Sequence, residues 1–106
     1  MDTLVSIRVF CTVAELKSFT AAAKRLGVSP AMTSKHVMRL EERLSARLLN
    51  RTSRHVSLTE SGALYFEQAR QMVDGLDELD GILERRKADV ELVLKWALQF
   101  QQIADG

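Results

Sequence analysis

The residues of this chain best suited to bind a partner lie in a short stretch that begins at Ser29. Ser29, Pro30 and Ala31 open a helical pattern, and Ser34 and Lys35 follow one turn later on the same face. Lys35 can donate to O6 and N7 of guanine, and Ser34 can donate to a base or to a phosphate. Pro30 and Ala31 can pack against the methyl group of thymine. If this helix lies in the major groove of DNA, the residues placed to contact base edges are Ser29, Pro30, Ala31, Ser34 and Lys35.

A second group of residues carries side chains that bind phosphate. Ser18 and Thr20 combine hydroxyl groups with the free amides of a helix N-terminus, where the helix dipole favours an anion. Arg54 is expected at the tip of a wing, from which it can enter a narrow A·T minor groove and contact bases. For any single Lys or Arg, a solvated surface charge is an equally good interpretation. Further phosphate contacts are expected from His36, Arg39, Arg43, Arg51 and Thr52.

Two helices joined by a tight turn must position these side chains. Ser18 can cap the first helix, and Gly27 can end it because glycine adopts the left-handed conformation at little cost. Ser29 can cap the second helix, and Pro30 fits its first position, where a missing amide hydrogen costs nothing. Small residues at 22 and 23 allow the two helices to approach closely. This arrangement is typical of a helix-turn-helix, whose second helix enters the major groove of DNA.

The charges of the chain are divided unevenly between its two halves. Residues 1–58 contain ten Lys and Arg against four Asp and Glu, a net charge of +6. Residues 59–106 contain five against ten, a net charge of −5, so the total of +1 hides the asymmetry. A basic first half fits the binding of phosphates and argues against the alternative of a helical hairpin without a ligand.

The helix-turn-helix is flanked by one element on each side. Residues 2–16 have apolar side chains at helical spacing, which predicts a helix that supports the two others. Residues 48–58 place an Arg-, Ser- and Thr-rich stretch between Leu48-Leu49 and Val56–Leu58. These apolar flanks predict two short strands and therefore a two-stranded wing.

The last part of the chain carries a heptad pattern that begins after Thr59. Thr59 can cap a long helix, and Glu60 suits its first turn. Apolar residues then recur at 4-3 spacing, which is typical of a seam between two helices. The preferred interpretation is a seam against a second copy of the chain; the alternative is a single helix folded back on its own domain. The expected interface residues are Tyr65, Ala69, Met72, Leu76, Leu79 and Leu83.

The run from Asp2 to about Leu83 resembles the N-terminal winged helix-turn-helix and linker helix of LysR-type transcriptional regulators. The motifs that carry the resemblance are Phe19-Thr20-Ala21-Ala22-Ala23, Ser34-Lys35-His36-Val37, Leu40-Glu41 followed by Leu44, Leu48-Leu49-Asn50-Arg51, and Leu58-Thr59-Glu60-Ser61-Gly62. The family favours a small residue where this chain has Met32, so the resemblance does not define the local packing of the recognition helix at this position. Glu41 is expected to pair with an Arg inside the protein rather than to contact DNA.

The expected fold is mainly α: three helices and a two-stranded wing, followed by a long linker helix. The expected boundaries are 1–58 for the DNA-binding domain, 59–87 for the linker helix and 88–106 for a helical tail that buries Trp96 and Phe100 against a partner. The effector-binding domain that the family carries after the linker helix is expected to be absent from this chain. The sequence also predicts no signal peptide or membrane span, and the single Cys11 excludes an internal disulfide and fits a reducing cytoplasm.

The expected function is sequence-specific regulation of transcription by a homodimer bound to double-stranded operator DNA. No metal-binding, nucleophilic or phosphate-loop motif indicates an enzyme, a cofactor or a small-molecule ligand. The alternative is a dimerisation module that traps full-length relatives in heterodimers. The operator sequence, the regulated genes and the sign of regulation do not follow from the sequence.

Overall fold

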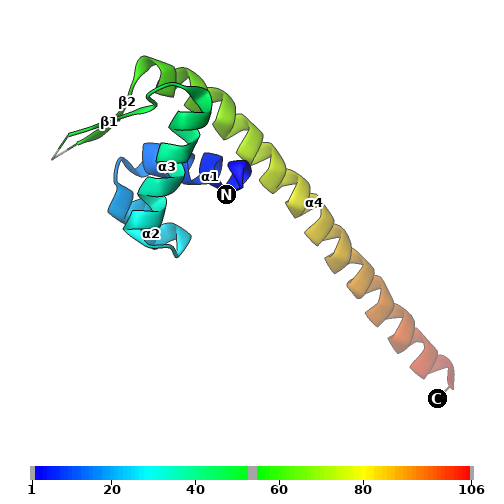
Figure 1. Ribbon diagram of the computed structural model, residues 1–106. Coiled ribbons are helices and arrows are strands. Elements are labelled where there is room, and N and C mark those ends of the chain that lie inside the picture. Colours follow the sequence, from blue (N-terminus) through cyan, green and yellow to red (C-terminus); the bar gives the residue numbers. More distant parts are fainter. Residues whose placement is uncertain (1, 53–54, 106) are drawn as a thin grey trace. The chain divides into compact units, whose positions relative to one another are not determined.

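The computed structural model describes the backbone of residues 2–52 and 55–105, and the side chains of residues 2–52 and 55–101. The chain divides into two compact units, of which the first ends at Val73 and the second begins at Asp74. The expected fold class, a mainly helical winged helix-turn-helix with a long C-terminal helix, is confirmed (Figure 1). The elements in order are α1 (Thr3–Leu16), α2 (Phe19–Leu26), α3 (Pro30–Leu44), β1 (Leu49–Arg51), β2 (Val56–Leu58) and α4 (Glu60–Asp105).

Local capping sets the ends of the helices in the first unit. The side chains of Ser18 and Ser29 accept hydrogen bonds of 3.1 Å from the amides of Ala21 and Met32, one turn into α2 and α3. Gly27 ends α2 in the left-handed conformation, with φ of 71°. The turn of the helix-turn-helix is therefore the one that the sequence predicts.

Helices α1, α2 and α3 share a core that is centred on Phe10. Its fully buried ring lies 5.8 Å from the ring of Tyr65 and 6.2 Å from that of Phe66, both in α4. Ala22 and Ala23 are buried in α2, which lets its backbone approach its neighbours closely. The other large side chains that are almost completely buried are Leu40, Leu48, Leu49, Val13, Val37 and Thr33.

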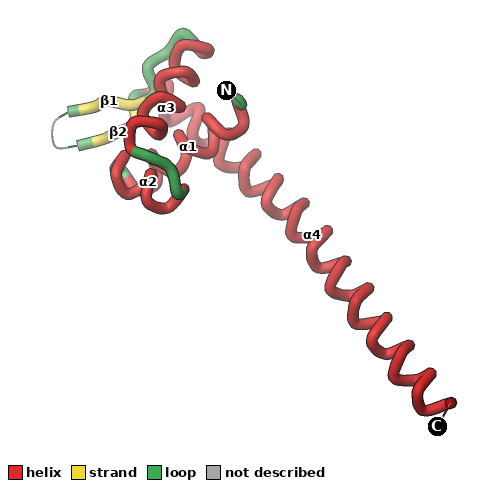
Figure 2. The backbone as a smooth tube through the Cα atoms, turned by 60° about the horizontal axis from the view of Figure 1, so that its bottom comes forward, coloured by secondary structure: helices red, strands yellow, loops and turns green. Residues whose placement is uncertain are grey.

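The wing is an antiparallel pair of three-residue strands (Figure 2). Leu49 pairs with Leu58 and Arg51 pairs with Val56. Beyond the strands, the Thr52 amide donates to the carbonyl oxygen of His55 at 3.0 Å, and the His55 amide donates to Oγ1 of Thr52 at 3.0 Å. Leu49 is buried in the core, so the wing is tied to the helices at its base.

The start of α4 is fixed by its contacts with the residues before the wing. Oγ1 of Thr59 accepts a hydrogen bond from the Gly62 amide at 2.9 Å and donates to the carbonyl oxygen of Arg47. The Thr59 amide donates to the carbonyl oxygen of Leu48 at 3.0 Å. A side chain at position 62 would collide with the backbone of Leu48, since an added Cβ would lie 1.9 Å from its carbonyl oxygen. Glycine is therefore required here for space.

The first turns of α4 belong to the core of the first unit, which changes the interpretation of the heptad pattern. Tyr65 packs on Phe10, and Ala69 is buried in the same cluster. The sequence assigned both residues to an interface between two chains. The structure places them inside one chain instead, because the 4-3 spacing suits packing on α1 as well as packing on a second helix.

From Asp74 onward, α4 forms the second unit, and most of its apolar side chains are exposed. Leu79 and Leu83 of the expected seam are among them, as are Trp96 and Phe100, which is 75% exposed. The tail that was expected to be helical is part of α4 as far as Asp105. Among the described residues, no helix has the length and hydropathy needed to cross a membrane.

Candidate nucleic-acid interface

One face of α3 is exposed along its first turns and carries the residues expected to contact bases. Ser29, Pro30, Ala31 and Lys35 are all exposed. The opposite face is held in the core, where Thr33 is completely buried. The core therefore fixes α3 and leaves these side chains free to meet a partner.

At the N-terminus of α2, the two expected phosphate ligands differ in their surroundings. The Ser18 hydroxyl already accepts the Ala21 amide, and its residue is half-buried. Thr20 is exposed in the first turn. The helix dipole favours an anion at this end, so both residues stay in the predicted phosphate-binding set.

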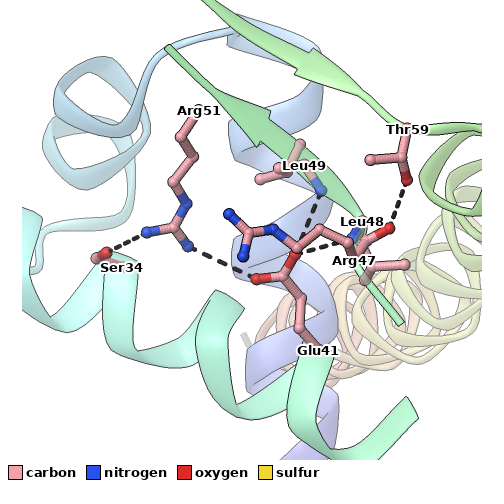
Figure 3. A network of polar contacts seen from close by, with 7 residues as sticks. All are labelled: Ser34, Glu41, Arg47, Leu48, Leu49, Arg51 and Thr59. Carbon is pink, nitrogen blue, oxygen red and sulfur yellow. Dashed lines mark hydrogen bonds and ion pairs between the residues drawn. The ribbon is translucent and has the colours of Figure 1, made fainter. Parts of the chain in front are cut away.

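Arg51 in β1 contacts side chains of α2 and α3, and Figure 3 shows its two partners in α3. Its Nη1 donates to Oγ of Ser34 at 2.9 Å, and its Nη2 lies 3.8 Å from Oε1 of Glu41. Its guanidinium carbon lies 4.5 Å from the ring centroid of Phe19, a cation–π contact. Arg51 was predicted to bind phosphate, but in the structure its guanidinium is held by α2 and α3 of its own chain.

Glu41 completes this network. Its Oε2 accepts hydrogen bonds from the amides of Leu48 at 2.8 Å and Leu49 at 3.4 Å (Figure 3). Only 15% of its side-chain surface is exposed. The expectation that Glu41 is an internal partner of an Arg is confirmed by its ion pair with Arg51. The carboxylate connects the start of the wing to α3.

His36 does not lie where a phosphate ligand is needed. Its residue is only 8% exposed, and its Nδ1 is hydrogen-bonded to Oγ of Ser6 in α1 at 3.1 Å. The spacing of α3 turns this side chain towards α1 and away from the exposed face. We therefore remove His36 from the predicted phosphate ligands.

The remaining basic residues of α3 and of the wing occupy different places. Arg43 donates to the Thr3 hydroxyl at the start of α1, and Arg39 lines a shallow pocket beside it. Both are exposed. Thr52 uses its hydroxyl within the wing, where it donates to the carbonyl oxygen of His55 at 3.1 Å. Arg54, predicted to contact bases from the wing tip, lies outside the described residues.

Two contacts of this network could not be predicted from the sequence. Phe19 packs against the core and also supports the Arg51 guanidinium. The capping of two wing amides by Glu41 depends on contacts across seven and eight residues. Neither periodicity nor local capping rules can identify such contacts. Within the described ranges, no group of His, Cys, Asp and Glu could hold a metal ion.

Comparisons with known proteins agree with this geometry. Residues 4–63 match the family model described as bacterial regulatory helix-turn-helix protein, lysR family. An uncharacterized HTH-type transcriptional regulator of Haemophilus influenzae is 42% identical over 91 residues, which cover 86% of this chain and 32% of that protein. The HTH-type transcriptional repressor PA14_22550 of Pseudomonas aeruginosa is 42% identical over 83 residues, 78% of this chain and 26% of the relative. The chain thus spans about a third or less of the length of these curated relatives.

Solved structures of similar fold include complexes with DNA. The BenM_DBD/catB site 1 DNA complex contains a chain that is 33% identical, with a TM-score of 0.73 over 80% of this chain and 93% of the other. The DNA complex of DarR from Vibrio fischeri is 26% identical, with a TM-score of 0.68 over 79% of this chain and 28% of the other.

Proposed function

We propose that this chain, which belongs to the lysR family of bacterial regulatory helix-turn-helix proteins, binds operator DNA sequence-specifically as a homodimer. The domain is a DNA-binding domain of transcriptional regulators and not an enzyme domain. The proposal assigns α3 to the major groove. The observation that carries it is the exposed face of Ser29, Pro30, Ala31 and Lys35 on a helix whose other face is fixed in the core.

Base contacts are expected from this face, and phosphate contacts from its surroundings. Lys35 presents an ammonium group that can donate to guanine O6 and N7. Ser18 and Thr20 at the start of α2 bind one phosphate, and Arg39 and Arg43 bind others. The DNA complexes formed by BenM_DBD and DarR support double-stranded DNA as the partner.

Replacing Lys35 tests the base contacts. Lys35→Ala is expected to weaken binding to the preferred duplex by about 1–3 kcal/mol more than binding to random duplex, because a base contact is specific and a phosphate contact is not. Lys95→Ala removes the same charge from the acidic half of the chain and is the matched control. It should change neither the affinity for the preferred duplex nor that for random duplex. Equal losses on both duplexes with Lys35→Ala would show that Lys35 does not contact a base.

The dimer in this proposal is based on exposed apolar side chains of the second unit. The 4-3 spacing of the predicted seam continues beyond Leu83 and is interrupted only by Arg86. Soluble monomers rarely expose a continuous apolar stripe, and 4-3 spacing is the pattern by which paired helices interlock. The continued stripe consists of Leu76, Leu79, Leu83, Val90, Val93, Ala97 and Phe100, of which all but Leu76 are exposed.

The charges along α4 favour an antiparallel pair of helices. A parallel pair in register would bring the two Arg86 side chains together in one layer of the seam, where like charges repel. In an antiparallel pair, Arg86 can face the partner's Leu83, and Asp80 then lies beside the partner's Lys87. A shift by one heptad in either direction would instead place Asp80 beside the partner's Asp80, or Lys87 beside the partner's Lys87. The register with opposite charges is therefore preferred.

Disulfide cross-linking distinguishes these arrangements. In the preferred register, Leu79 faces the partner's Val90, so the Leu79→Cys, Val90→Cys double variant should form a covalent dimer under mild oxidation. Leu79→Cys alone should not, because two copies of residue 79 would be separated by 11 residues along the helix, about 16 Å. The wild-type chain is the control, since its Cys11 is buried. Cross-linking of the single variant would indicate a parallel pair, and no cross-linking of either variant would exclude this interface.

Charged substitutions in the seam connect the dimer with DNA binding. Leu76→Asp with Leu79→Asp should give a monomer in sedimentation, with the first unit still folded because it has its own core. Affinity for a site with two half-sites should fall, because the two recognition helices no longer bind as one unit. A monomer with undiminished affinity would contradict the role of the dimer. A wild-type dimer that fails to retain DNA would favour the alternative of a dimerisation module.

A further inference from the structure

The hydroxyl of Ser34 accepts a hydrogen bond from another residue of the same chain. Nη1 of Arg51 donates to Oγ of Ser34 at 2.9 Å (Figure 3). A guanidinium has only donors, so Ser34 must accept in this bond. One of the two acceptor sites of the hydroxyl is thereby filled, and its single hydrogen is not used by this contact. In the part of the chain that the structure describes, no hydrogen bond from the Ser34 hydroxyl to an acceptor is found.

Arg51 cannot easily move away from Ser34. Its guanidinium is held by the carboxylate of Glu41 and by the ring of Phe19, and only 30% of its side-chain surface is exposed. Glu41 is in turn fixed by the amides of Leu48 and Leu49 at the start of the wing. The orientation of the Ser34 hydroxyl is therefore set by the position of the wing relative to α3.

We propose that Arg51 makes Ser34 a hydrogen-bond donor towards DNA, so that Ser34 selects for a base that presents an acceptor in the major groove. Two physical effects favour Ser34 as the donor, rather than the acceptor, of a hydrogen bond to DNA. The bond from a charged donor polarises the hydroxyl, which strengthens its hydrogen as a donor. A second donor that approached Oγ would be repelled by the nearby guanidinium, and the Ser34 hydrogen would lose its bond to water without replacement.

This proposal rests on the proposed function, in which α3 lies in the major groove, and it adds a specificity rule. Acceptors in that groove are N7 of both purines, O6 of guanine and O4 of thymine. The N4 amino group of cytosine is a donor. At the position that faces Ser34, the contacted strand should therefore exclude cytosine. Arg51 acts in this rule as a positioning residue, without contacting the base.

The experiment begins with the preferred duplex selected from a random pool by the wild-type chain. Each purine of one half-site is then replaced, one at a time, by its 7-deaza analogue, which removes the N7 acceptor. For the wild-type chain, replacement of the purine that faces Ser34 should lower affinity by roughly threefold to tenfold, the loss expected for a single hydrogen bond. Ser34→Ala should lower affinity for the unmodified duplex and show no further loss at this purine, whereas replacement of a guanine contacted by Lys35 should still weaken its binding. If the contacted base is thymine, substitution of cytosine at that position gives the same comparison.

Variants of Arg51 test its positioning role. Arg51→Met keeps an apolar stem on Phe19 but removes the donors, so a repeated selection should tolerate cytosine at the position assigned to Ser34. Arg51→Lys, which retains a charged donor, should restore part of the preference. Arg39→Met is the control for loss of a charge, and it should weaken binding to all duplexes alike. Ser34→Ala provides an independent test if Arg51→Met does not fold.

The outcomes separate this inference from the proposed function. Failure of the wild-type chain to prefer any duplex would contradict the proposed function itself. A clear preference that is identical in the wild type, Arg51→Met and Ser34→Ala would overturn only the role of Ser34 and Arg51. A second control replaces single phosphates of the duplex by neutral methylphosphonates. If Ser34→Ala removes the effect of one such replacement and of no base replacement, Ser34 contacts phosphate, and the proposed selection of a base by Ser34 is overturned.

Discussion

Replacing Gly62 with alanine should disrupt the junction between the wing and α4. The added Cβ would lie 1.9 Å from the carbonyl oxygen of Leu48, 2.8 Å from its carbonyl carbon and 3.1 Å from its Cα. All three are backbone atoms, so no change of rotamer can relieve the collision. The backbone around Leu48 must move, although alanine is otherwise the residue that best favours a helix.

The expected loss can be worked from the contacts that this movement disturbs. Overpacking of a tight site costs about 1–3 kcal/mol. The Leu48 carbonyl also accepts the Thr59 amide at 3.0 Å, and the Leu48 amide donates to Glu41 at 2.8 Å. Weakening these two hydrogen bonds adds about 1 kcal/mol each. We expect a total loss of about 3–5 kcal/mol in the free energy of unfolding, a large part of the stability of a small domain.

Thermal unfolding followed by far-ultraviolet circular dichroism measures this loss. The Tm of Gly62→Ala should fall by more than about 10 °C, since 1 kcal/mol corresponds to about 4–8 °C in a domain of this size. Gly81→Ala is the matched control in the same helix, because its added Cβ meets only the end of the Arg85 side chain at 3.5 Å. It should leave the Tm unchanged or raise it. A Tm of Gly62→Ala close to that of the wild type would refute the packing described at this junction.

Three further predictions concern single side chains. Glu41→Gln should lower the free energy of unfolding by about 1–2 kcal/mol in urea denaturation, because a charged acceptor of two amides and Arg51 is lost; no change would contradict this role. His36→Ala should destabilise the domain while the dependence of DNA affinity on salt keeps its slope, whereas a slope reduced by about one unit would restore His36 as a phosphate ligand. Burial raises the pKa of Tyr65 above its ordinary value of 10.0, against the opposing charge of Arg43. Ionisation therefore favours the unfolded chain, so stability should be fully present below pH 10.0 and decline as the pH rises through the higher folded-state pKa. Tyr65→Phe should show less of this decline, and an equal decline in both proteins would contradict the assignment.

The helix-turn-helix could be predicted from the sequence because its determinants are local. Ser18, Gly27, Ser29 and Pro30 each act within one turn of the backbone, and the structure finds three of them as caps and the fourth at the first position of α3. The wing was predicted from its apolar flanks, which pair as β1 and β2. Such features need no knowledge of distant parts of the chain.

The incorrect predictions concern side chains that could contact either a partner molecule or a neighbour in the same chain. Tyr65 and Ala69 fit a seam between two helices, but Phe10 of the same chain meets them first. His36 has the chemistry of a phosphate ligand, but its position on α3 faces Ser6. The sequence does not identify the Arg that pairs with Glu41, and only the fold shows that Arg51 is this partner; a phosphate contact by Arg51 stays a prediction. Tertiary contacts determine where these side chains lie, and the periodicity of the sequence does not predict such contacts.

The most direct test of the central claim is selection of duplexes from a random pool by the purified wild-type chain. A dimer that places α3 in the major groove should enrich one sequence with two half-sites related by a dyad, separated by about one helical turn or a multiple of it. Each half-site should contain a guanine whose enrichment disappears with Lys35→Ala. Enrichment of no sequence, or of one unaffected by Lys35→Ala, would contradict the claim that α3 recognises DNA.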